Sequence, residues 1–543
     1  MAGRLGLNSV QPVIAHGELP SRAVIGEPVG IEATVFREGH DAVAASVQWR
    51  SPDGVLAPFN RMHPLGGGTD RWRTEVVADV KGSWSYVVEA WSDPLGTWYH
   101  AVEVKSDAGQ GADELANDLE IGAQLFEQLA DTAEQADEAD QSGTAARAEL
   151  ARAIAADLRR TDVDLQLRIT RAMSREARLL AHDHPVRELI TRSPRYHVWV
   201  DRQRALYGAW YEFFPRSINA ELASDPADPA RPTRHGTLVD ATKHLDYVAD
   251  LDFDVVYLPP IHPIGRVNRK GPNNTLDAKP TDTGSPWAIG SPEGGHDAIH
   301  PELGDEDDFA AFVARARELE LEVALDLALQ CAPDHPWVDK HPEWFTTLPD
   351  GSIAYAENPP KKYQDIYPLN FDNDPSGLAA EVLRITMLWV SRGVKIFRVD
   401  NPHTKPLSFW QWLIGNVKAQ DPDVLFLAEA FTRPAMMHEL ARIGFTQSYT
   451  YFTWRNTAWE LRQYGEELVA AADYMRPNFF PNTPDILNEF LVTGGRSAFA
   501  LRLVLATMMV PSYGIYSGYE LYENEPVRPG SEEYLNSEKF QLR

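Results

Sequence analysis

Three short apolar runs decide the fold, and they are KIFRVD at residues 395–400, LFLAE at 425–429 and NFFPNTPD at 478–485. Each run ends in an acid: Asp400, Glu429 and Asp485. An acid at the carboxyl end of a buried strand leaves the core and reaches the rim where barrel enzymes hold their catalytic residues. The three runs therefore predict a barrel with an acidic active site.

The sequence around these runs predicts the rest of the barrel. From about residue 205, strand-like and helix-like segments alternate, as they do in a parallel sheet. The predicted strands are GAWYEFF, DVVYLPP, EVALDLAL, KIFRVD, LFLAEA, TQSYTYF, PNFFPN and YGIYSG. Helical patterns at 305–319, 378–391 and 434–443 lie between them, with Asp or Pro near their starts. Eight such strands favour a (β/α)₈ TIM barrel, and we assign the catalytic domain to residues 191–543.

Two connections of the predicted barrel, 262–303 and 333–376, are too long to be simple turns. Loops of this length are usually functional or disordered. Their content of Trp, Tyr, His and Lys favours ordered, functional insertions. The sequence reaches Arg543 soon after the eighth strand, so we expect a C-terminal part, which includes a closing helix, to be missing.

The first 190 residues differ from the rest in their composition and in the spacing of their apolar residues. Residues 1–106 predict an N-terminal β-sandwich, because apolar and other residues alternate around Val29 to Val35 and again around Trp84 to Ala90. Residues 107–190 are rich in Ala, Leu, Glu, Gln and Arg with helical spacing, and predict a helical insert. This insert is either a solvated helical hairpin or a subunit interface, and the sequence leaves both open.

Composition limits the class of protein. The 543 residues are 43% apolar, which is enough material for more than one core. The net charge of −28 argues against nucleic acid or an anionic membrane surface as the main partner. We find no apolar run that approaches the roughly 18 to 20 residues of a spanning helix, and the first residues do not have a signal peptide's apolar core. A single cysteine, Cys331, allows no intramolecular disulfide. We therefore expect a cytoplasmic, multidomain enzyme.

The three acids suit chemistry at a sugar's anomeric carbon. Breaking a glycosidic or glycosyl phosphate bond requires one carboxylate near that carbon and one protonatable acid at the leaving oxygen. Arg398 lies two residues before Asp400 on the same strand face and would keep Asp400 ionised. Glu429 would need a raised pKa to act as acid and then base, and Asp485 would hold sugar hydroxyls. The alternative is that the acids merely cap helices or pair with neighbouring Arg and Lys.

Four sequence regions, ALDLALQC with Asp326, FRVDNPH, FLAEA and PNTPD, resemble the ordered conserved regions of the α-amylase superfamily. The resemblance implies that Asp400 is the nucleophile, Glu429 the acid/base and Asp485 the third acid of a retaining double displacement through a β-glycosyl-enzyme intermediate. It departs at Gln330–Cys331 and at Pro484, where a typical hydrolase of that superfamily carries His.

A narrower resemblance covers nearly the whole chain. The segments GRVNRKGPNN, WAIGSPEGGHDAIHPELG, HPEWF, AENPPKKYQDIYPLNFD and VDNPHTKP resemble the α-1,4-glucan:maltose-1-phosphate maltosyltransferases. That family implies transfer of a maltosyl unit from α-maltose 1-phosphate to the non-reducing end of an α-1,4-glucan with release of phosphate. It also implies a homodimer and a further C-terminal β domain that this sequence lacks.

The family's substrate contacts map onto particular residues. Lys361, Tyr363 and Asn401 resemble its phosphate contacts. The positions around its two donor sugar subsites are Lys270, Asn274, Gln330, Asp365, Arg398 and Lys539. Phe540 beside Lys539 would lose one hydroxyl contact if the family's residue there is Tyr. We predict no cofactor and no metal, and we assign no catalytic role to His296 or His403. Trp287, Trp337 and Trp344 either stack on acceptor glucose rings or pack inside the two long loops.

Two other functions remain open at this point. One is an α-glucan hydrolase or transglycosidase of the α-amylase superfamily. The other is a glucan-binding or scaffold protein with an inert barrel, against which the three intact acids argue.

Overall fold

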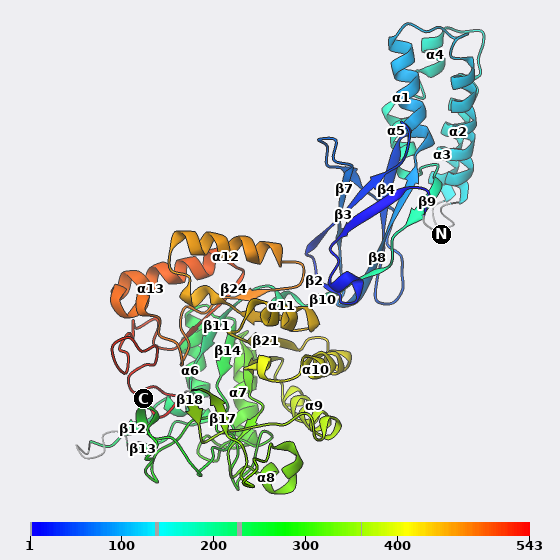
Figure 1. Cartoon of the computed structure of the whole chain (residues 1–543). Helices are drawn as coiled ribbons and strands as arrows, with labels where there is room; N and C mark the ends of the chain where they lie inside the picture. Colours follow the sequence, from blue (N-terminus) through cyan, green and yellow to red (C-terminus); the bar gives the residue numbers. More distant parts are fainter. Residues whose placement is uncertain (1–2, 136–140, 225–230, 360) are drawn as a thin grey trace. The chain divides into compact units, whose positions relative to one another are not determined.

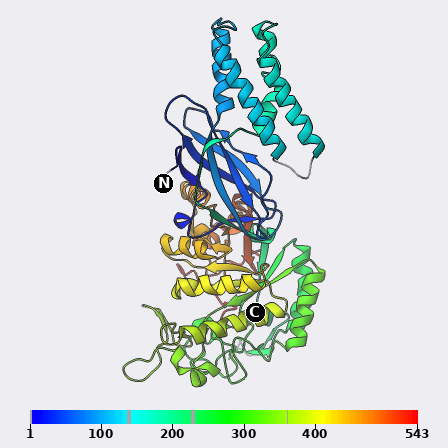
Figure 2. The same cartoon turned by 90° about the vertical axis from the view of Figure 1, so that its right-hand side faces the viewer.

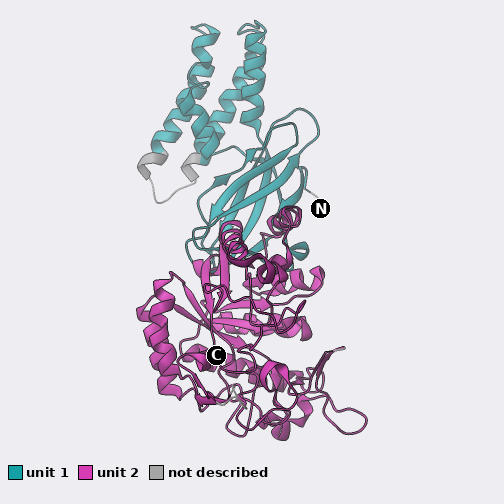
Figure 3. Cartoon of the chain, turned by 90° about the vertical axis from the view of Figure 1, so that its left-hand side faces the viewer, with its two compact units in different colours: residues 1–200 teal, residues 201–543 magenta. Residues whose placement is uncertain are grey.

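The computed structural model describes residues 3–135, 141–224, 231–359 and 361–543, which form two compact units, Met1–Val200 and Asp201–Arg543 (Figure 3). Residues 136–140 of the predicted helical insert and residue 360 of the predicted 333–376 insertion lie outside the described residues. The division falls after Val200 rather than at residue 191, where we had expected the barrel domain to begin.

Two sheets form the β-sandwich of the first unit (Figure 1). One sheet consists of β1 (Gly6–Gln11), β3 (Pro28–Phe36), β7 (Arg71–Val77) and β6 (His63–Pro64), in that order. The other consists of β2 (Ser21–Val24), β10 (Tyr196–Asp201), β8 (Gly82–Ser92), β4 (Val43–Arg50) and β5 (Asn60–Arg61), with β9 (Glu188–Arg192) paired to β8. Alternate residues of β3, including Ile31 and Val35, are buried in a core that they share with Val47 and Val88 of the other sheet. This two-residue period is the pattern that predicted the sandwich.

The helices of the first unit are inserted between β8 and β9. They are α1 (Pro94–Asp107), α2 (Ala116–Gln135), α3 (Gln141–Leu158), α4 (Leu165–Ile169) and α5 (Arg175–Asp183). Asp93 caps α1 by accepting a hydrogen bond from the Gly96 backbone N–H, so the helical part begins earlier than residue 107. Figures 1 and 2 show α2 and α3 side by side. Trp98, Phe126 and Leu129 are buried in a core among these helices, which therefore pack on a core of their own.

The second unit is the predicted (β/α)₈ barrel. Its strands are β11 (Gly208–Glu212), β14 (Val255–Leu258), β15 (Glu322–Leu327), β20 (Ile396–Asp400), β21 (Leu425–Glu429), β22 (Gln447–Tyr449), β23 (Pro477–Asn478) and β24 (Ser512–Tyr516), and they coincide with the eight predicted runs. Neighbours in the order β23-β22-β21-β20-β15-β14-β11-β24 are paired. A parallel bridge between Phe479 and Tyr513 joins the remaining two strands and closes the barrel.

The barrel strands are parallel, so their carboxyl ends meet at one rim. Between the strands lie α6 (Leu238–Asp250), α7 (Glu306–Glu318), α9 (Pro375–Ser391), α10 (Leu407–Gln420), α11 (Pro434–Ile443), α12 (Ala458–Ala470) and α13 (Glu489–Met509). Acidic residues cap the N-termini of several of these helices. The Asp305 carboxylate accepts from backbone N–H groups at the start of α7, and Asp374 does so at the start of α9.

By length and apolarity alone, α13 would be able to cross a membrane, which corrects our expectation that no segment reaches this level. In the barrel, α13 is the helix between the seventh and eighth strands. Leu491 and Phe499 pack into the barrel core, and the buried Arg502 guanidinium lies 3.7 Å over the Phe452 ring. A core helix of a soluble domain passes the same test, so the observation is weak evidence for a membrane.

Both long connections fold over the carboxyl-end rim with short elements. The second includes α8 (Pro336–Lys340), β17 (Ala356–Asn358) paired with β18 (Lys361–Tyr363), and β19 (Tyr367–Pro368), which pairs with β16 (Gln330–Cys331) just before the connection. The β17–β18 hairpin carries two of the residues predicted to contact phosphate. A small hairpin of β12 (Glu221–Leu222) and β13 (Pro232–Arg234) follows the first strand.

Candidate active site

The barrel strands place the three predicted acids at one rim. Asp400 and Glu429 are the last residues of β20 and β21 and are direct partners in the parallel register of these strands. Neighbouring strands lie about 4.8 Å apart, so the two side chains start side by side. Asp485 follows β23 by seven residues on the loop that leads to α13 and lines the same pocket.

Arg398 connects the acids. Its buried guanidinium donates from Nη1 to Asp326 Oδ2 and to Asp400 Oδ1, both at 2.9 Å. Its Nη2 lies 3.3 Å from Glu429 Oε1. Burial alone would lower the pKa of Arg398, but the surrounding carboxylates, Glu429 first, raise it well above its ordinary value. The guanidinium therefore stays charged and contacts both the nucleophile candidate, Asp400, and the acid/base candidate, Glu429.

Glu429 has the protonation behaviour that a general acid requires. Burial raises the pKa of its carboxyl to about 7, and the Asp400 charge adds to this rise while Arg398 opposes it. The Asn401 backbone N–H donates to Glu429 Oε2 at 3.1 Å. Asn401 reaches this position with a left-handed φ of 41°, a conformation that Asn tolerates better than most residues. A carboxyl with a pKa near neutrality can both give and take a proton at physiological pH.

A pocket of about 940 Å³ contains the acids and almost every predicted contact residue. The predicted residues that line it are Lys270, Asn274, Gln330, Lys361, Tyr363, Asp365, Asp400, Asn401, Glu429, Asp485 and Lys539. Arg398 is the exception, because it lies buried beneath the pocket against Asp400 and Glu429. The structure therefore brings together residues that are up to 269 positions apart in the sequence, from Lys270 to Lys539.

Two of the cations that line this pocket are Lys539 and Lys361. Lys539 Nζ forms an ion pair with Asp485 and lies 5.2 Å over the Trp287 ring. Burial alone would lower the pKa of Lys539, but Asp485 outweighs it and raises the pKa above its usual value. Lys361, on β18, is exposed, and it lines the pocket together with Tyr363 and Asn401. This second group provides one positive charge and two hydrogen-bonding side chains for an anion.

Two residues of the site escaped the sequence prediction. Lys405 lines the pocket and donates to Thr404 Oγ1 at 2.8 Å, and burial lowers its pKa. Glu212 ends the first barrel strand, is buried, and neither of its carboxylate oxygens has a hydrogen-bond partner among the described residues. Burial raises the pKa of Glu212 well above its ordinary value. An acid inside the apolar run GAWYEFF is the same signal that identified Asp400, and it could have identified Glu212.

Comparisons with known proteins agree on one family. Residues 3–202 match the model of the α-1,4-glucan:maltose-1-phosphate maltosyltransferase N/S domain. An α-1,4-glucan:maltose-1-phosphate maltosyltransferase of Streptomyces coelicolor is 55% identical in an alignment of 544 positions that covers all of this chain and 77% of that protein. The protein of the same name from Mycolicibacterium smegmatis is 52% identical, over all of this chain and 79% of its own length. The chain belongs to this family of enzymes.

The barrel also aligns with a solved α-amylase of Lactobacillus plantarum, with a TM-score of 0.47 and 25% identity over 61% of this chain and 75% of that one.

The three tryptophans considered in the sequence analysis have different environments. Trp287 lines the pocket, is buried, and donates from Nε1 to Asp326 Oδ2 at 3.2 Å. Trp337 and Trp344 are buried against each other with ring centroids 5.2 Å apart, and they line a separate pocket of about 690 Å³. Of the two interpretations, packing inside the loop therefore describes Trp337 and Trp344.

His296, Cys331 and His335 lie together, with possible ligand atoms within 4.8 Å of one another. Hydrogen bonds connect the two histidines in a chain in which each donor can be assigned. The Trp337 backbone N–H donates to His335 Nδ1 at 3.0 Å, His335 Nε2 lies 3.2 Å from His296 Nδ1, and His296 Nε2 lies 2.8 Å from the Ala328 carbonyl. Neutral rings satisfy every one of these contacts, and burial lowers the pKa of both histidines. The cluster is thus a hydrogen-bonded support for the loop that carries Gln330, since no ring nitrogen in it keeps a free lone pair for a metal.

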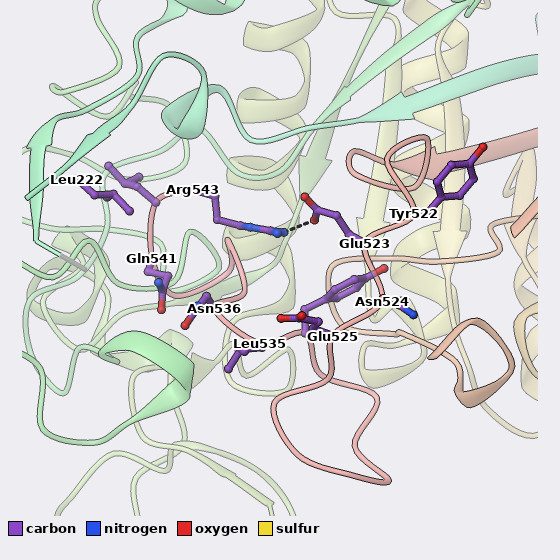
Figure 4. A pocket seen from close by; sticks show the side chains of 11 residues that line it. Leu222, Tyr522, Glu523, Asn524, Glu525, Leu535, Asn536, Gln541 and Arg543 are labelled. Carbon is purple, nitrogen blue, oxygen red and sulfur yellow. Dashed lines mark ion pairs between the residues drawn. The ribbon is translucent and has the colours of Figure 1, made fainter. Parts of the chain in front are cut away.

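Another pocket, of about 480 Å³, lies beside the last residues of the maltosyltransferase chain (Figure 4). Arg543 and Glu523 form an ion pair across it, and Gln541 and Asn536 also line it. None of the residues predicted to bind substrate lines this pocket.

Proposed function

We propose that this chain transfers a maltosyl unit from α-maltose 1-phosphate to the non-reducing end of an α-1,4-glucan and releases phosphate. The observation that carries the proposal is the pair Asp400 and Glu429 under one guanidinium, at the base of a pocket that also contains Lys361, Tyr363 and Asn401. The names of the relatives in Streptomyces coelicolor and Mycolicibacterium smegmatis support the same donor and acceptor.

The first step forms a covalent intermediate. Asp400 Oδ attacks the anomeric carbon as Glu429 gives its proton to the bridging oxygen, and the bond between the anomeric carbon and that oxygen breaks. Phosphate leaves beside Lys361, Tyr363 and Asn401, whose charge and N–H or O–H groups stabilise the departing anion. Retaining enzymes hold their two carboxyls only about 5 to 5.5 Å apart, and the direct pairing of Asp400 with Glu429 across adjacent strands supports this mechanism over inversion.

The second step regenerates the enzyme. Glu429, now ionised, removes the proton of an acceptor hydroxyl, whose oxygen attacks the anomeric carbon, and the ester bond to Asp400 breaks. Lys270, Asn274, Gln330, Asp365 and Lys539 would hold the two glucose rings of the donor, because buried polar groups discriminate strongly between sugars that do and do not satisfy them. Arg398, which was predicted to join them, would act through Asp400 and Glu429 beneath the pocket. Asp485 would hold ring hydroxyls as the transition state distorts the sugar.

Trapping tests this mechanism. A 2-fluoro maltosyl donor should label the peptide that contains Asp400, as mass spectrometry would detect, and a label elsewhere would overturn the assignment. Incubation with glycogen and phosphate should give a new glycosyl phosphate signal by phosphorus NMR. Reducing sugar without that signal would favour an α-glucan hydrolase instead.

We also propose that the protein is a cytoplasmic homodimer that associates through the first unit. The family resemblance and the large helical insert motivate the association. Light scattering checks it, since a monomer mass would reject the dimer, and fractionation of the source cells checks the location.

A further inference from the structure

Glu212 is the last residue of β11, and its side chain points into the barrel. Tyr211, one residue earlier, faces the surrounding helices, because its ring lies against Tyr247 of α6 with centroids 6.3 Å apart. Successive side chains of a strand point to opposite faces, so Glu212 faces the interior. It is only 1% exposed. A carboxyl group at such a position costs free energy unless it is hydrogen-bonded.

Three side chains of this interior have polar atoms without a hydrogen-bond partner among the described residues. The atoms are both carboxylate oxygens of Glu212, Oδ1 of Asp326 and Nε of Arg398. Asp326 and Arg398 are direct partners in the register of β15 and β20, and Arg398 Nη1 donates to the other oxygen of Asp326 at 2.9 Å. Among the surrounding charges, that of Arg398 acts most strongly on Glu212, and that of Asp326 follows. The four atoms therefore belong to one buried polar cluster.

The atoms of this cluster complement one another in hydrogen bonding. Arg398 Nε–H only donates, Oδ1 of an ionised Asp326 only accepts, and a protonated carboxyl group does both. Burial raises the pKa of the Glu212 carboxyl well above its ordinary value, and the charge of Arg398 does not reverse this rise. Glu212 can thus accept on the side of Arg398 and donate on the side of Asp326. Buried polar atoms without a protein partner usually bond to internal water.

The Arg398 guanidinium connects this cluster to the catalytic acids. Its Nη1 contacts Asp400, and its Nη2 contacts Glu429. Its central carbon lies 5.8 Å from the centre of the Tyr257 ring and 5.7 Å from that of the Tyr449 ring. These rings limit its movement sideways, whereas only a hydrogen bond at Nε would fix its rotation. A rotation would change the contacts to Asp400 and Glu429 together.

We propose that Glu212 is a positioning residue of the transfer reaction, which holds Arg398 Nε and Asp326 Oδ1 through hydrogen bonds carried by internal water and thereby orients the guanidinium between Asp400 and Glu429. This inference rests on the proposed function. Glu212 does not line the pocket, so it acts through Arg398 and exchanges no proton with the substrate. Besides Arg398, the ionisable groups that interact with Glu212 are Asp326, Asp485, Glu429, Tyr257, Tyr449 and Tyr534.

Two variants of Glu212 separate hydrogen bonding from volume. Glu212→Gln keeps a neutral side chain that donates and accepts, whereas Glu212→Met has a similar length and does neither. The kcat for phosphate release from α-maltose 1-phosphate at saturating glucan should stay within about threefold in Glu212→Gln and fall about tenfold or more in Glu212→Met. The KM for both substrates should stay within about threefold in both variants, because Glu212 does not line the pocket.

The pH profile distinguishes a positioning role from a general loss of structure. In Glu212→Met the alkaline limit of kcat should move to higher pH, because a guanidinium that is held less firmly stabilises ionised Glu429 less. In Glu212→Gln this limit should stay at the wild-type pH. Glu466→Met, at an exposed position on α12, is the matched control and should change neither kcat nor its alkaline limit.

The outcomes that would overturn the positioning role are distinct from those that refute the proposed function. A wild-type kcat in Glu212→Met, a lower kcat whose alkaline limit does not move, or an equal loss in Glu212→Gln would each overturn the role and leave the proposed function standing. A wild type that releases no phosphate from α-maltose 1-phosphate would refute both. If Glu212→Met does not fold, Glu212→Asp decides, because its shorter side chain should give the same fall in kcat and the same shift, and wild-type values would overturn the role.

Discussion

Replacing Glu429 by glutamine should stabilise the protein while it abolishes turnover. In the folded chain, burial raises the pKa of Glu429 from an ordinary 4.5 to about 7. The unfolded chain loses this proton near pH 4.5 and the folded chain only near pH 7, so folding takes up a proton between these values. The free energy of unfolding of the wild type therefore falls as pH rises through this window. Above pH 7, where Glu429 is ionised in both states, the whole of this loss is present.

The size of the effect follows from the shift. Each pKa unit is worth about 1.4 kcal/mol, so the ionised Glu429 costs at most about 3 kcal/mol of stability at alkaline pH. Glutamine has the same shape and no charge, and it avoids this cost. For a unit of about 340 residues the entropy of unfolding is about 0.7 kcal/mol per kelvin, so a gain of about 3 kcal/mol raises Tm by about 4 °C.

Thermal unfolding of wild type and Glu429→Gln at several pH values measures this difference. The gain in Tm should be small at pH 5 and should grow to about 4 °C at pH 8. Glu466→Gln, at an exposed position on α12, is the matched control and should change Tm equally little at both values. A gain that is as large at pH 5 as at pH 8 would refute the reasoning, because it would show that ionisation of the buried Glu429 carboxyl does not destabilise the barrel.

Three further outcomes are expected. Release of phosphate from the donor should slow tenfold per pH unit above about pH 7, because Glu429 must keep its proton for that step, and a rate that stays flat to pH 9 would exclude Glu429 as the acid. Lys418→Met should lower Tm by roughly 4 to 7 °C, since it removes the buried ammonium that forms an ion pair with Asp201, at a cost of about 3–5 kcal/mol, and adding Asp201→Asn should recover most of the loss. Cys331 is buried and burial raises the pKa of its thiol, so Ellman's reagent should label it in urea and leave it unmodified in buffer, where prompt labelling would contradict its burial.

The barrel could be predicted from the sequence because its strands are buried on both faces. Such strands appear as continuous apolar runs between turns, and each of the eight runs contains one strand. Their ends were less predictable. TQSYTYF contains a strand of only Gln447–Tyr449, and its last two residues, Tyr451 and Phe452, belong to the short helix that carries Trp454. Apolar character indicates burial, but it does not distinguish the last residues of a strand from the first residues of the helix that follows.

The site could be predicted only in part. Acids at strand ends must share a rim, so the sequence was sufficient to bring Asp400 and Glu429 together. Residues on the long loops, such as Lys361, have no period that fixes their position, and the family resemblance carried that prediction. Phe431 and Trp454, which also line the pocket, were missed because each residue looks like ordinary core. Their positions become visible only when the fold brings η7 (Tyr451–Trp454) against the loop after β21.

One cation, Arg398, lies among the carboxyls of this barrel and allows some of them to be ionised. Several acids within a few ångströms in a buried site cannot all be ionised unless positive charge lies among them. Arg398 contacts Asp326 and Asp400 at 2.9 Å and Glu429 only at 3.3 Å.

Contact with this guanidinium does not by itself set the order of the pKa values. Burial raises the pKa of Asp326, whose Oδ2 lies 2.9 Å from Arg398 Nη1, to about 7, as it raises the pKa of Glu429. Asp326 accepts hydrogen bonds from Tyr257 and Trp287 and does not line the pocket, whereas Asp400 and Glu429 do, so these two acids are the ones that can meet a substrate. Glu212, which has no hydrogen-bond partner among the described residues, retains its proton well above the usual range. Burial, the guanidinium and access to the pocket together therefore divide the roles of the acids, and a lysine ammonium, with one nitrogen instead of two, would not contact the three carboxylates in the same way.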